Sequence, residues 1–425
     1  METVWMTVLI SGVVAVATAA VSWWLKDRRS CPKADLYNVY ANVLDYGADP
    51  RGKKDSSNAV KKALENNKLV FFPSGTYLMD QVEICGSVTL QGAGSNATVI
   101  KARNLTGNVF SFSGDNWHLK DMKFVAEDYR TEGAYIFSNG RDGSIENVSI
   151  EQHYVGFDLD GAININIINT TARCGTPHCV AKGGAAIRLG NTKYTGQVNI
   201  RGMFAWPATR VPNPTVAQVL ELQPSTAITM KYVDVVAISD TLLIGHTKDV
   251  LIAPGKDQFA ALIEITDCCF DTAQSGLCME PTDGGRVLRN GFANTWFGAH
   301  TGDGVVIDGT DGTVPGAQFT NCMFMGNGGD GVKILGKGVN GIYFSNCFSS
   351  SNACNGLTVA QKAQNAVWSG GVIGASHEAG PNLNYGFRVE DGCSGRIMLT
   401  DLRGNTLGAG NNPGECVILL NNIVV

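Results

Sequence analysis

Charged residues are scarce in this chain: they make up 17% of its 425 residues, and the net charge is −5. There is no basic patch with interleaved aromatic residues, which argues against a nucleic-acid partner. The 12 cysteines are too few for a disulfide-stapled scaffold, so we expect most of them to be buried thiols. The six histidines show no metal-binding spacing. We therefore predict neither a metal site nor a cofactor.

Charge is absent altogether between Thr3 and Leu25, and a basic flank follows at 26–29. A helix of this length reaches about 34 Å, enough to cross the hydrocarbon core of a membrane. A cleaved secretory signal is the alternative, since Ala17-Thr18-Ala19 offers a cleavage pattern, but no positive charge precedes the apolar run. We predict a transmembrane helix over 4–25, an anchor with its flank over 1–29, and a membrane-associated, single-pass protein. The basic flank would keep the body on the cytoplasmic face.

Long amphipathic stretches are few, whereas glycine is abundant at 51 residues, a composition that favours many short strands and tight turns. One series of residues recurs at intervals of 27, 27, 27 and 25: Asp240, Asp267, Asn294, Asn321 and Asn346. A second series recurs at intervals of 27: Phe270, Phe297 and Phe324. A fixed period of this length is typical of a solenoid, and the spacing of leucine-rich repeats is absent. We predict an all-β fold, a single-stranded right-handed parallel β-helix, with the Asp/Asn series as a ladder of stacked turn residues.

The segment 42–77 carries the most specific motif. It reads Asn-Val-Leu-Asp-Tyr-Gly-Ala-Asp over 42–49 and ends with Val-Phe-Phe-Pro-Ser-Gly-Thr-Tyr over 70–77. This resembles the N-terminal signature of the pectate-lyase-like β-helix superfamily, which includes many phage tailspike proteins. The resemblance implies a helix that caps the N-terminal end of the coils, and contact with carbohydrate. We accordingly assign 30–84 to a linker and the cap, and 85–425 to the β-helix.

The catalytic signatures of that superfamily are incomplete here. Polygalacturonase-like members carry a paired Asp-Asp and a Gly-His-Gly, whereas this chain has no Asp-Asp dipeptide and only Gly245-His246-Thr247. Pectate lyases carry Arg-X-Pro-X-X-Arg near a calcium site, and the nearest segment, 210–215, lacks the second arginine. The sequence therefore reproduces none of these enzymes.

Asp303 and Asp330 remain as a candidate catalytic pair. Each lies within Gly-Asp-Gly, and the interval of 27 places them on adjacent coils. Their backbones would be about 5 Å apart, close to the carboxylate separation of retaining glycosidases. Two alternatives stay open: a bound cation, and plain turn residues, since Asn355-Gly356 fills the same position one coil later.

Two tryptophans, Trp206 and Trp296, are candidates for glycan binding, because an indole can stack on a sugar ring. Trp296 stands next to Phe297 of the repeat, so a place in the core is its alternative. Five acids also gather within 20 residues: Glu264, Asp267, Asp271, Glu280 and Asp283. Alternation along a strand would spread them over different faces, and a convergent site is not assured.

These features favour a membrane-anchored β-helix that serves as a structural or receptor- and glycan-binding protein of a virion. The chain stops at Val425 without room for the C-terminal trimerisation domain common in tailspikes, which favours a minor capsid or membrane-to-capsid component. Its partners would be a membrane, through residues 4–25, other capsid proteins, and a polysaccharide. The alternative is a surface-anchored polysaccharide lyase or glycoside hydrolase.

Overall fold

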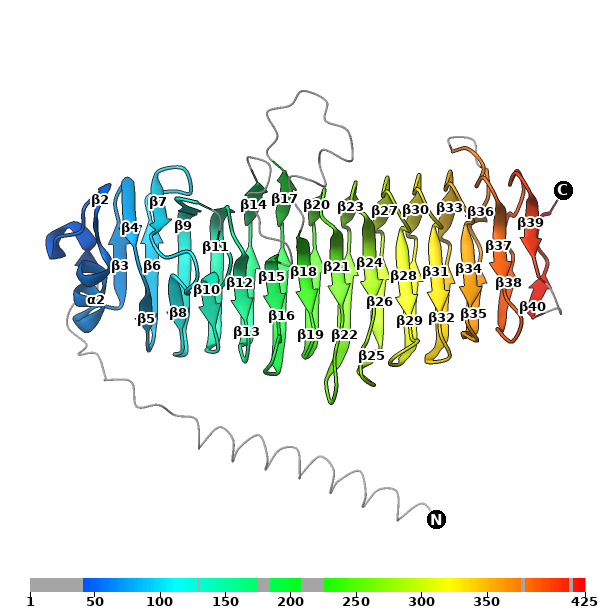
Figure 1. Cartoon of the computed structure of the whole chain (residues 1–425), viewed down its shortest axis with the longest axis horizontal. Coiled ribbons are helices and arrows are strands. Elements are labelled where there is room, and N and C mark those ends of the chain that lie inside the picture. Colours follow the sequence, from blue (N-terminus) through cyan, green and yellow to red (C-terminus); the bar gives the residue numbers. More distant parts are fainter. Residues whose placement is uncertain are drawn as a thin grey trace, which may run out of the picture. The chain divides into compact units, whose positions relative to one another are not determined.

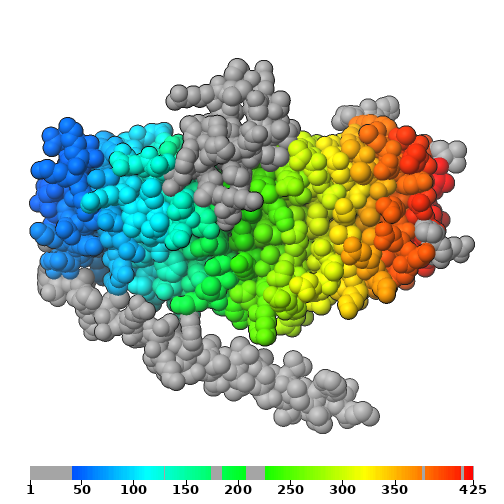
Figure 2. Space-filling model, viewed as in Figure 1, coloured from blue at the N-terminus to red at the C-terminus, as the bar shows by residue number. Residues whose placement is uncertain are grey.

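The computed structural model describes residues 41–128, 130–174, 184–207, 225–375, 379–412 and 416–424. Within these ranges the chain forms a parallel β-helix, in which each strand pairs in parallel with the equivalent strands of the coils before and after it. Figure 1 shows the coils following one another from β2 to β40, and Figure 2 shows the same chain order on the surface. The predicted all-β, parallel β-helix is therefore confirmed, while its right-handed sense stays a prediction.

The strands of the coils form three faces. The first is a separate sheet of 13 strands, which we call the middle face after its place in Figure 1. Its strands are β5 (Val82–Ile84), β8 (Phe110–Phe112), β10 (Ala134–Ser138), β12 (Val155–Leu159), β15 (Ala185–Leu189), β18 (Thr226–Met230), β21 (Lys248–Ile252), β24 (Ser275–Met279), β28 (Val305–Asp308), β31 (Val332–Leu335), β34 (Leu357–Ala360), β37 (Tyr385–Val389) and β39 (Gly408–Asn411).

The other two faces belong to one sheet of 27 strands, because β9 (Trp117–Ala126) and β11 (Arg141–Glu151) run through both. The long face also contains β1 (Ala41–Asn42), β3 (Leu69–Phe72), β6 (Val88–Gly92), β13 (Ile163–Ile168), β16 (Thr195–Arg201), β19 (Val233–Ser239), β22 (Phe259–Thr266), β25 (Arg286–Leu288), β26 (Asn290–Ala293), β29 (Val314–Thr320), β32 (Val339–Ser345), β35 (Gln364–Ser369), β38 (Gly395–Met398) and β40 (Val417–Leu420). The short face also contains β2 (Arg51–Asp55), β4 (Gly75–Met79), β7 (Thr98–Ala102), β14 (Thr171–Cys174), β17 (Phe204–Pro207), β20 (Leu242–Ile244), β23 (Cys269–Asp271), β27 (Trp296–Gly298), β30 (Met323–Met325), β33 (Phe348–Ser350) and β36 (Val372–Ile373).

A small helical cap lies at the N-terminal end, formed by the 3-10 helix η1 (Val43–Tyr46) and the helix α2 (Ser57–Asn66). The start of α2 is fixed by Asp55, whose Oδ1 accepts the backbone N–H of Ser57 at 2.9 Å. Its buried residues include Val60 and Ala63, which form the apolar stripe expected from the sequence. Parallel pairing already begins at β1, so coils start inside the segment 30–84 that we expected to be linker and cap.

The corner between the long and short faces carries the Asp/Asn series predicted from its spacing. The strand residues just before the series pair in register from Ser239 to Ser369, which confirms a single column. All five members have φ between 49° and 55°, the left-handed region that Asn and Asp tolerate best among non-glycine residues. Asn294 donates to Asp267 at 3.1 Å and Asn321 to Asn294 at 3.3 Å, which forms an exposed ladder.

The interior is filled by stacked apolar residues. Phe270, Phe297 and Phe324 are fully buried, as their repeat indicates. A second aromatic column consists of Phe292, Phe319, Phe344 and Trp368, with ring centroids 4.6, 4.9 and 4.8 Å apart. Such offset stacks stabilise neighbouring coils beyond the burial of their area.

A buried ladder of asparagines, which the sequence analysis did not identify, lies at the corner that joins the short and middle faces. Its members are Asn327, Asn352, Asn382 and Asn405, and each side-chain amide donates to the next at 2.8 to 2.9 Å. Asn327, Asn352 and Asn382 are at most 1% exposed. These bonds satisfy polar groups that would otherwise be costly in the interior.

The predicted membrane localisation needs correction. In the part of the chain that the structure describes, no helix has the length and apolar character to cross a membrane. The segment 4–25 lies outside the described residues. We therefore withdraw the assignment to a membrane and to a virion membrane or capsid layer.

Candidate functional site

The outward side chains of the short face form an apolar row, which we call the aromatic stripe. Strand register places its members on successive coils: Phe204, Leu242, Cys269, Trp296, Met323 and Phe348. Met323 is 43% exposed and Phe348 37%, although both are large apolar residues. Earlier coils of the same face instead carry ion pairs, such as Lys123 with Glu151 at 2.8 Å. The stripe is therefore a local feature of this face.

Trp296 lies at the centre of the stripe, and its ring is held flat along the strand. A Cβ atom on Gly298 would come within 2.5 Å of Cε2 and Cζ2 of the indole, so the ring covers this glycine. The indole N–H donates to Oδ2 of Asp271 at 3.1 Å, on the preceding coil. With one ring face against the sheet, the other points outward. An outward aromatic face attracts the weakly positive C–H groups of a sugar ring.

Trp206 lies on the same face, three coils earlier. Its ring packs edge-on against Phe204, with centroids 3.8 Å apart. The guanidinium of Arg173, on the coil before, lies 4.9 Å from the centroid of the indole. This cation–π contact orients the ring and adds a donor group for a hydroxyl or an anion. The structure thus places both predicted tryptophans on one face, and neither belongs to the core.

An open groove of about 630 Å³ borders the stripe. Its walls are the turns that follow β27, β30 and β33, with His300, Asn327 and Ser351 among the lining residues, and its far side contains Leu383. This volume lies within the range of small-molecule sites. Burial lowers the pKa of His300 to about 3, so the imidazole is neutral at pH 7.

The predicted pair Asp303 and Asp330 lies on adjacent coils, as expected, but its bonds are those of turn residues. Oδ1 of Asp303 accepts the backbone N–H of Asp330 at 2.7 Å, and Oδ1 of Asp330 accepts that of Asn355 at 2.8 Å. Oδ2 of Asp303 also pairs with Lys333 at 3.3 Å. Each carboxylate therefore supports the next coil. A catalytic role for the pair stays a prediction.

The cluster of five acids does not converge. Glu264 faces outward from the long face, and Asp267 belongs to the corner ladder. Asp271 lies on the short face, while Glu280 pairs with Lys248 of the middle face. Only Asp271 contributes to the candidate site. The signal that could have identified it is the spacing of 25 residues to Trp296, just under one coil.

Comparison with known proteins agrees with the fold. Residues 40–202 match the family model described as rhamnogalacturonase A/epimerase, pectate lyase-like. Alginate lyase 7 of Azotobacter vinelandii is 30% identical over 26% of this chain and 16% of its own length. A probable glucan endo-1,3-beta-glucosidase of Arthroderma benhamiae is 24% identical over 42% of this chain and 25% of its own. The chain thus spans no more than a quarter of either relative.

Solved structures share the fold at low identity. The tailspike protein of E. coli bacteriophage HK620, solved with a pentasaccharide, has a TM-score of 0.65 at 10% identity, covering 91% of this chain and 78% of its own. The A-module of the mannuronan C-5 epimerase AlgE6 of Azotobacter vinelandii has a TM-score of 0.57 at 14% identity, covering 90% of this chain and 99% of its own. The family match over residues 40–202 and the shared fold support the resemblance to the pectate-lyase-like β-helix superfamily.

Proposed function

We propose that this protein binds a polysaccharide along the aromatic stripe of its short face. The observation that carries the proposal is the indole of Trp296, laid over Gly298 and held by Asp271. A ring fixed in this way loses little conformational entropy on binding, which is how rigid aromatic anchors gain affinity. Coils are about 4.8 Å apart, so the three coil steps between Trp206 and Trp296 span roughly 14 Å, room for a short oligosaccharide.

Of the function expected from the sequence, only the glycan-binding part is kept in this proposal. The superfamily match and the tailspike fold support it, since the tailspike relative was solved with a pentasaccharide. A structural role in a virion has no supporting feature among the described residues.

Glycan cleavage is the second candidate function. The family model favours it, because its description names a rhamnogalacturonase and an epimerase. In that reaction one of the two carboxyl groups, Asp303 or Asp330, would act as the general acid and the other as the general base or nucleophile. Their engagement in turn contacts makes this candidate weaker than binding alone.

The binding proposal is tested by measuring affinity for a panel of plant, algal and bacterial polysaccharides before and after Trp296→Ala. We expect at least a tenfold loss for Trp296→Ala, and a further loss when Trp206→Ala is added. Tyr343→Ala is the matched control, because Tyr343 is an aromatic residue of the long face that is 47% exposed. Equal affinities of the wild type and both tryptophan variants would reject the proposal.

A further inference from the structure

A second group of aromatic side chains lies on the long face, away from the aromatic stripe. Tyr194 and Tyr232 immediately precede β16 and β19, and Phe259 begins β22; the residues that follow them, Thr195, Val233 and Ala260, are strand partners. Their ring centroids are 5.4 Å apart for the two tyrosines and 5.2 Å for Tyr232 and Phe259, both in edge-to-face geometry. Tyr194 is 38% exposed. Three rings on adjacent coils thus form a partly exposed aromatic surface.

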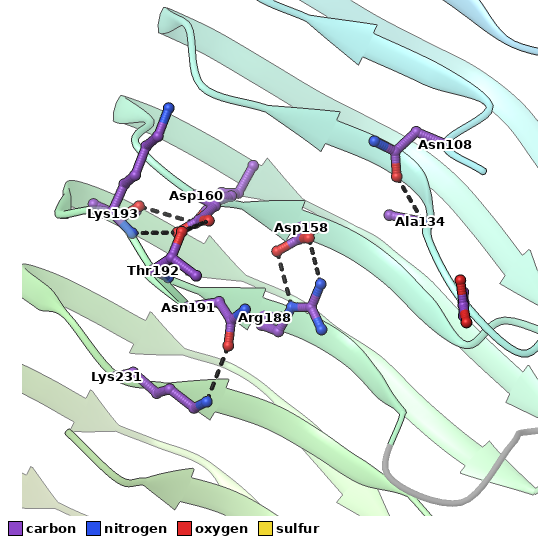
Figure 3. A network of polar contacts seen from close by, with 12 residues as sticks. Asn108, Ala134, Asp158, Asp160, Arg188, Asn191, Thr192, Lys193 and Lys231 are labelled. Carbon is purple, nitrogen blue, oxygen red and sulfur yellow. Dashed lines mark hydrogen bonds and ion pairs between the residues drawn. The ribbon is translucent and has the colours of Figure 1, made fainter. Parts of the chain in front are cut away.

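The turn that carries Tyr194 is firmly anchored, as Figure 3 shows. Asp160 accepts the backbone N–H groups of Thr192 and Lys193 at 2.8 and 2.7 Å. Nζ of Lys231 donates a hydrogen bond to Oδ1 of Asn191 at 3.0 Å. Two neighbouring coils therefore hold this turn from both sides. The aromatic surface is preorganised, which lowers the cost of binding a ligand.

A carboxylate with unused hydrogen-bonding capacity lies beside these rings. Asp234 is two residues after Tyr232 on β19, and its strand partner is Gly196. Its Oδ1 is shielded from solvent and has no hydrogen-bond partner within the described residues. Burial raises the pKa of Tyr194, and the nearby charge of Asp234 adds to this effect. An oxygen buried without a partner is costly, so this half-buried carboxylate keeps the capacity to accept a hydroxyl of a ligand.

The backbone next to this cluster is strained in an unusual way. A column of left-handed residues runs along the long face, and most of its members are glycine or polar: Asp142, Asn164, Gln197, Arg289, Gly316, Gly341 and Asn365. At the cluster it holds Val235 and Leu262 instead, with φ of 54° and 50°. Both are exposed, at 47% and 42%. A left-handed conformation is unfavourable for a β-branched residue, and strain of this kind concentrates at functional sites.

We propose that Tyr194, Tyr232, Phe259 and Asp234, with Val235 and Leu262 at the border, form a second binding site for a neutral sugar unit. The rings and the two aliphatic side chains contact the apolar side of the sugar ring, and the carboxylate of Asp234 accepts one of its hydroxyls. The carboxylate of Asp234 disfavours an anionic sugar at this position. The site shares the ligand class of the proposed function but none of its residues.

The test uses the full chain carrying Trp206→Ala and Trp296→Ala, which removes both indoles of the short face. Calorimetry with neutral gluco-, galacto- and manno-oligosaccharides should still detect binding, and an oligogalacturonate should bind at least tenfold more weakly. Adding Tyr194→Ala or Asp234→Ala should lower the remaining affinity at least tenfold. Adding Tyr343→Ala should leave it unchanged.

The strained residues supply a readout that a merely structural role would not give. Val235→Asn and Leu262→Asn relieve the backbone strain, so each should raise the melting temperature while weakening sugar binding several-fold. Unchanged sugar binding in both variants, at whatever melting temperature, would contradict the inference.

The remaining outcomes separate the two sites. If the wild type binds and the double tryptophan variant does not, the second site is rejected and the stripe stands. If Tyr194→Ala alone abolishes binding and the tryptophan changes have no effect, the stripe is rejected. Absence of sugar binding by the wild type counts against both. A concentration-dependent dimer that Val235→Asn dissociates would identify the surface as a contact between copies and overturn the sugar assignment.

Discussion

The exposed ladder and the buried ladder use the same amide side chains on the same stacked coils, yet they differ in how those amides are bonded. In the exposed ladder, Asn321 makes one side-chain bond, to Asn294 at 3.3 Å. In the buried ladder, Asn352 donates to Asn382 and to the carbonyl of Phe324, and accepts both the side-chain and backbone N–H groups of Asn327. The exposed asparagines serve chiefly to adopt the left-handed backbone conformation of the corner. The buried ones serve chiefly as hydrogen-bond partners for polar groups of the interior.

The largest effect should come from Asn352→Ala. This change leaves the backbone N–H of Asn327 unpaired inside the protein and creates a small cavity, so we expect a loss of about 3 kcal/mol in the free energy of unfolding. Urea denaturation measures it. Asn321→Ala is the matched control on the exposed ladder, with an expected loss of about 1 kcal/mol from the left-handed backbone. Equal losses at the two positions would erase the distinction between the ladders.

His300 sharpens the comparison, because it occupies the place of an asparagine one coil before the buried ladder. Its Nδ1 accepts a hydrogen bond from the backbone N–H of Ala273 at 3.1 Å, and the backbone N–H of His300 donates to Oδ1 of Asn327 at 3.3 Å. Burial lowers the pKa of His300 to about 3, below its ordinary value of 6.5. Between these two values the unfolded chain binds a proton that the folded chain does not, so stability falls as the pH falls below about 6.5.

At pH 5 the proton that His300 takes up on unfolding lowers the free energy of unfolding by about 2 kcal/mol. His300→Asn should extend the ladder and remove this contribution, so the variant should lose less stability than the wild type between pH 7 and pH 5. Denaturation curves at both pH values test it. Parallel losses in the two proteins would show that His300 does not titrate on unfolding.

The smallest effect is expected at the column of Asp303, which is half-buried, and Asp330, which is buried. Asparagine at either position can still accept the backbone N–H of the next coil, so the double change to Asn should alter stability by less than about 1 kcal/mol. Polysaccharide turnover, if the wild type shows any, should also stay the same. A drop of a hundredfold or more in cleavage by either single variant would instead establish the catalytic pair.

The regular part of the fold was accessible from the sequence because its constraints repeat. Asn294 and Phe297 stand in columns whose neighbours are 27 residues away, and the coil, its corner and its core follow from that interval. The buried ladder was not accessible, since Asn327 and Asn352 show the same spacing as the exposed asparagines and nothing in the spacing reveals burial. A fixed interval also cannot identify columns where the coils differ in length, as they do around Tyr194.

The candidate site was predictable in its residue types and not in its arrangement. Trp206 and Trp296 were identified as aromatic residues able to bind sugars, but their common face depends on strand register over three coils. The role of Asp271 depends on a contact between coils, and that of Gly298 on the absence of a side chain beneath the indole. Neither is encoded in a local motif.

Unequal coil lengths have a consequence for how such a protein can change over evolution. Contacting side chains on neighbouring coils are 22 residues apart at Ser149 and Thr171, 33 at Asn166 and Asn199, and 25 at Asn340 and Asn365, yet the strands remain in register. Extra residues are therefore absorbed at the corners, where lengthening a connection costs little. Insertions and deletions at the corners therefore leave the packing of the core almost unchanged. A lineage can thus exchange its corner segments repeatedly while one stack of coils persists.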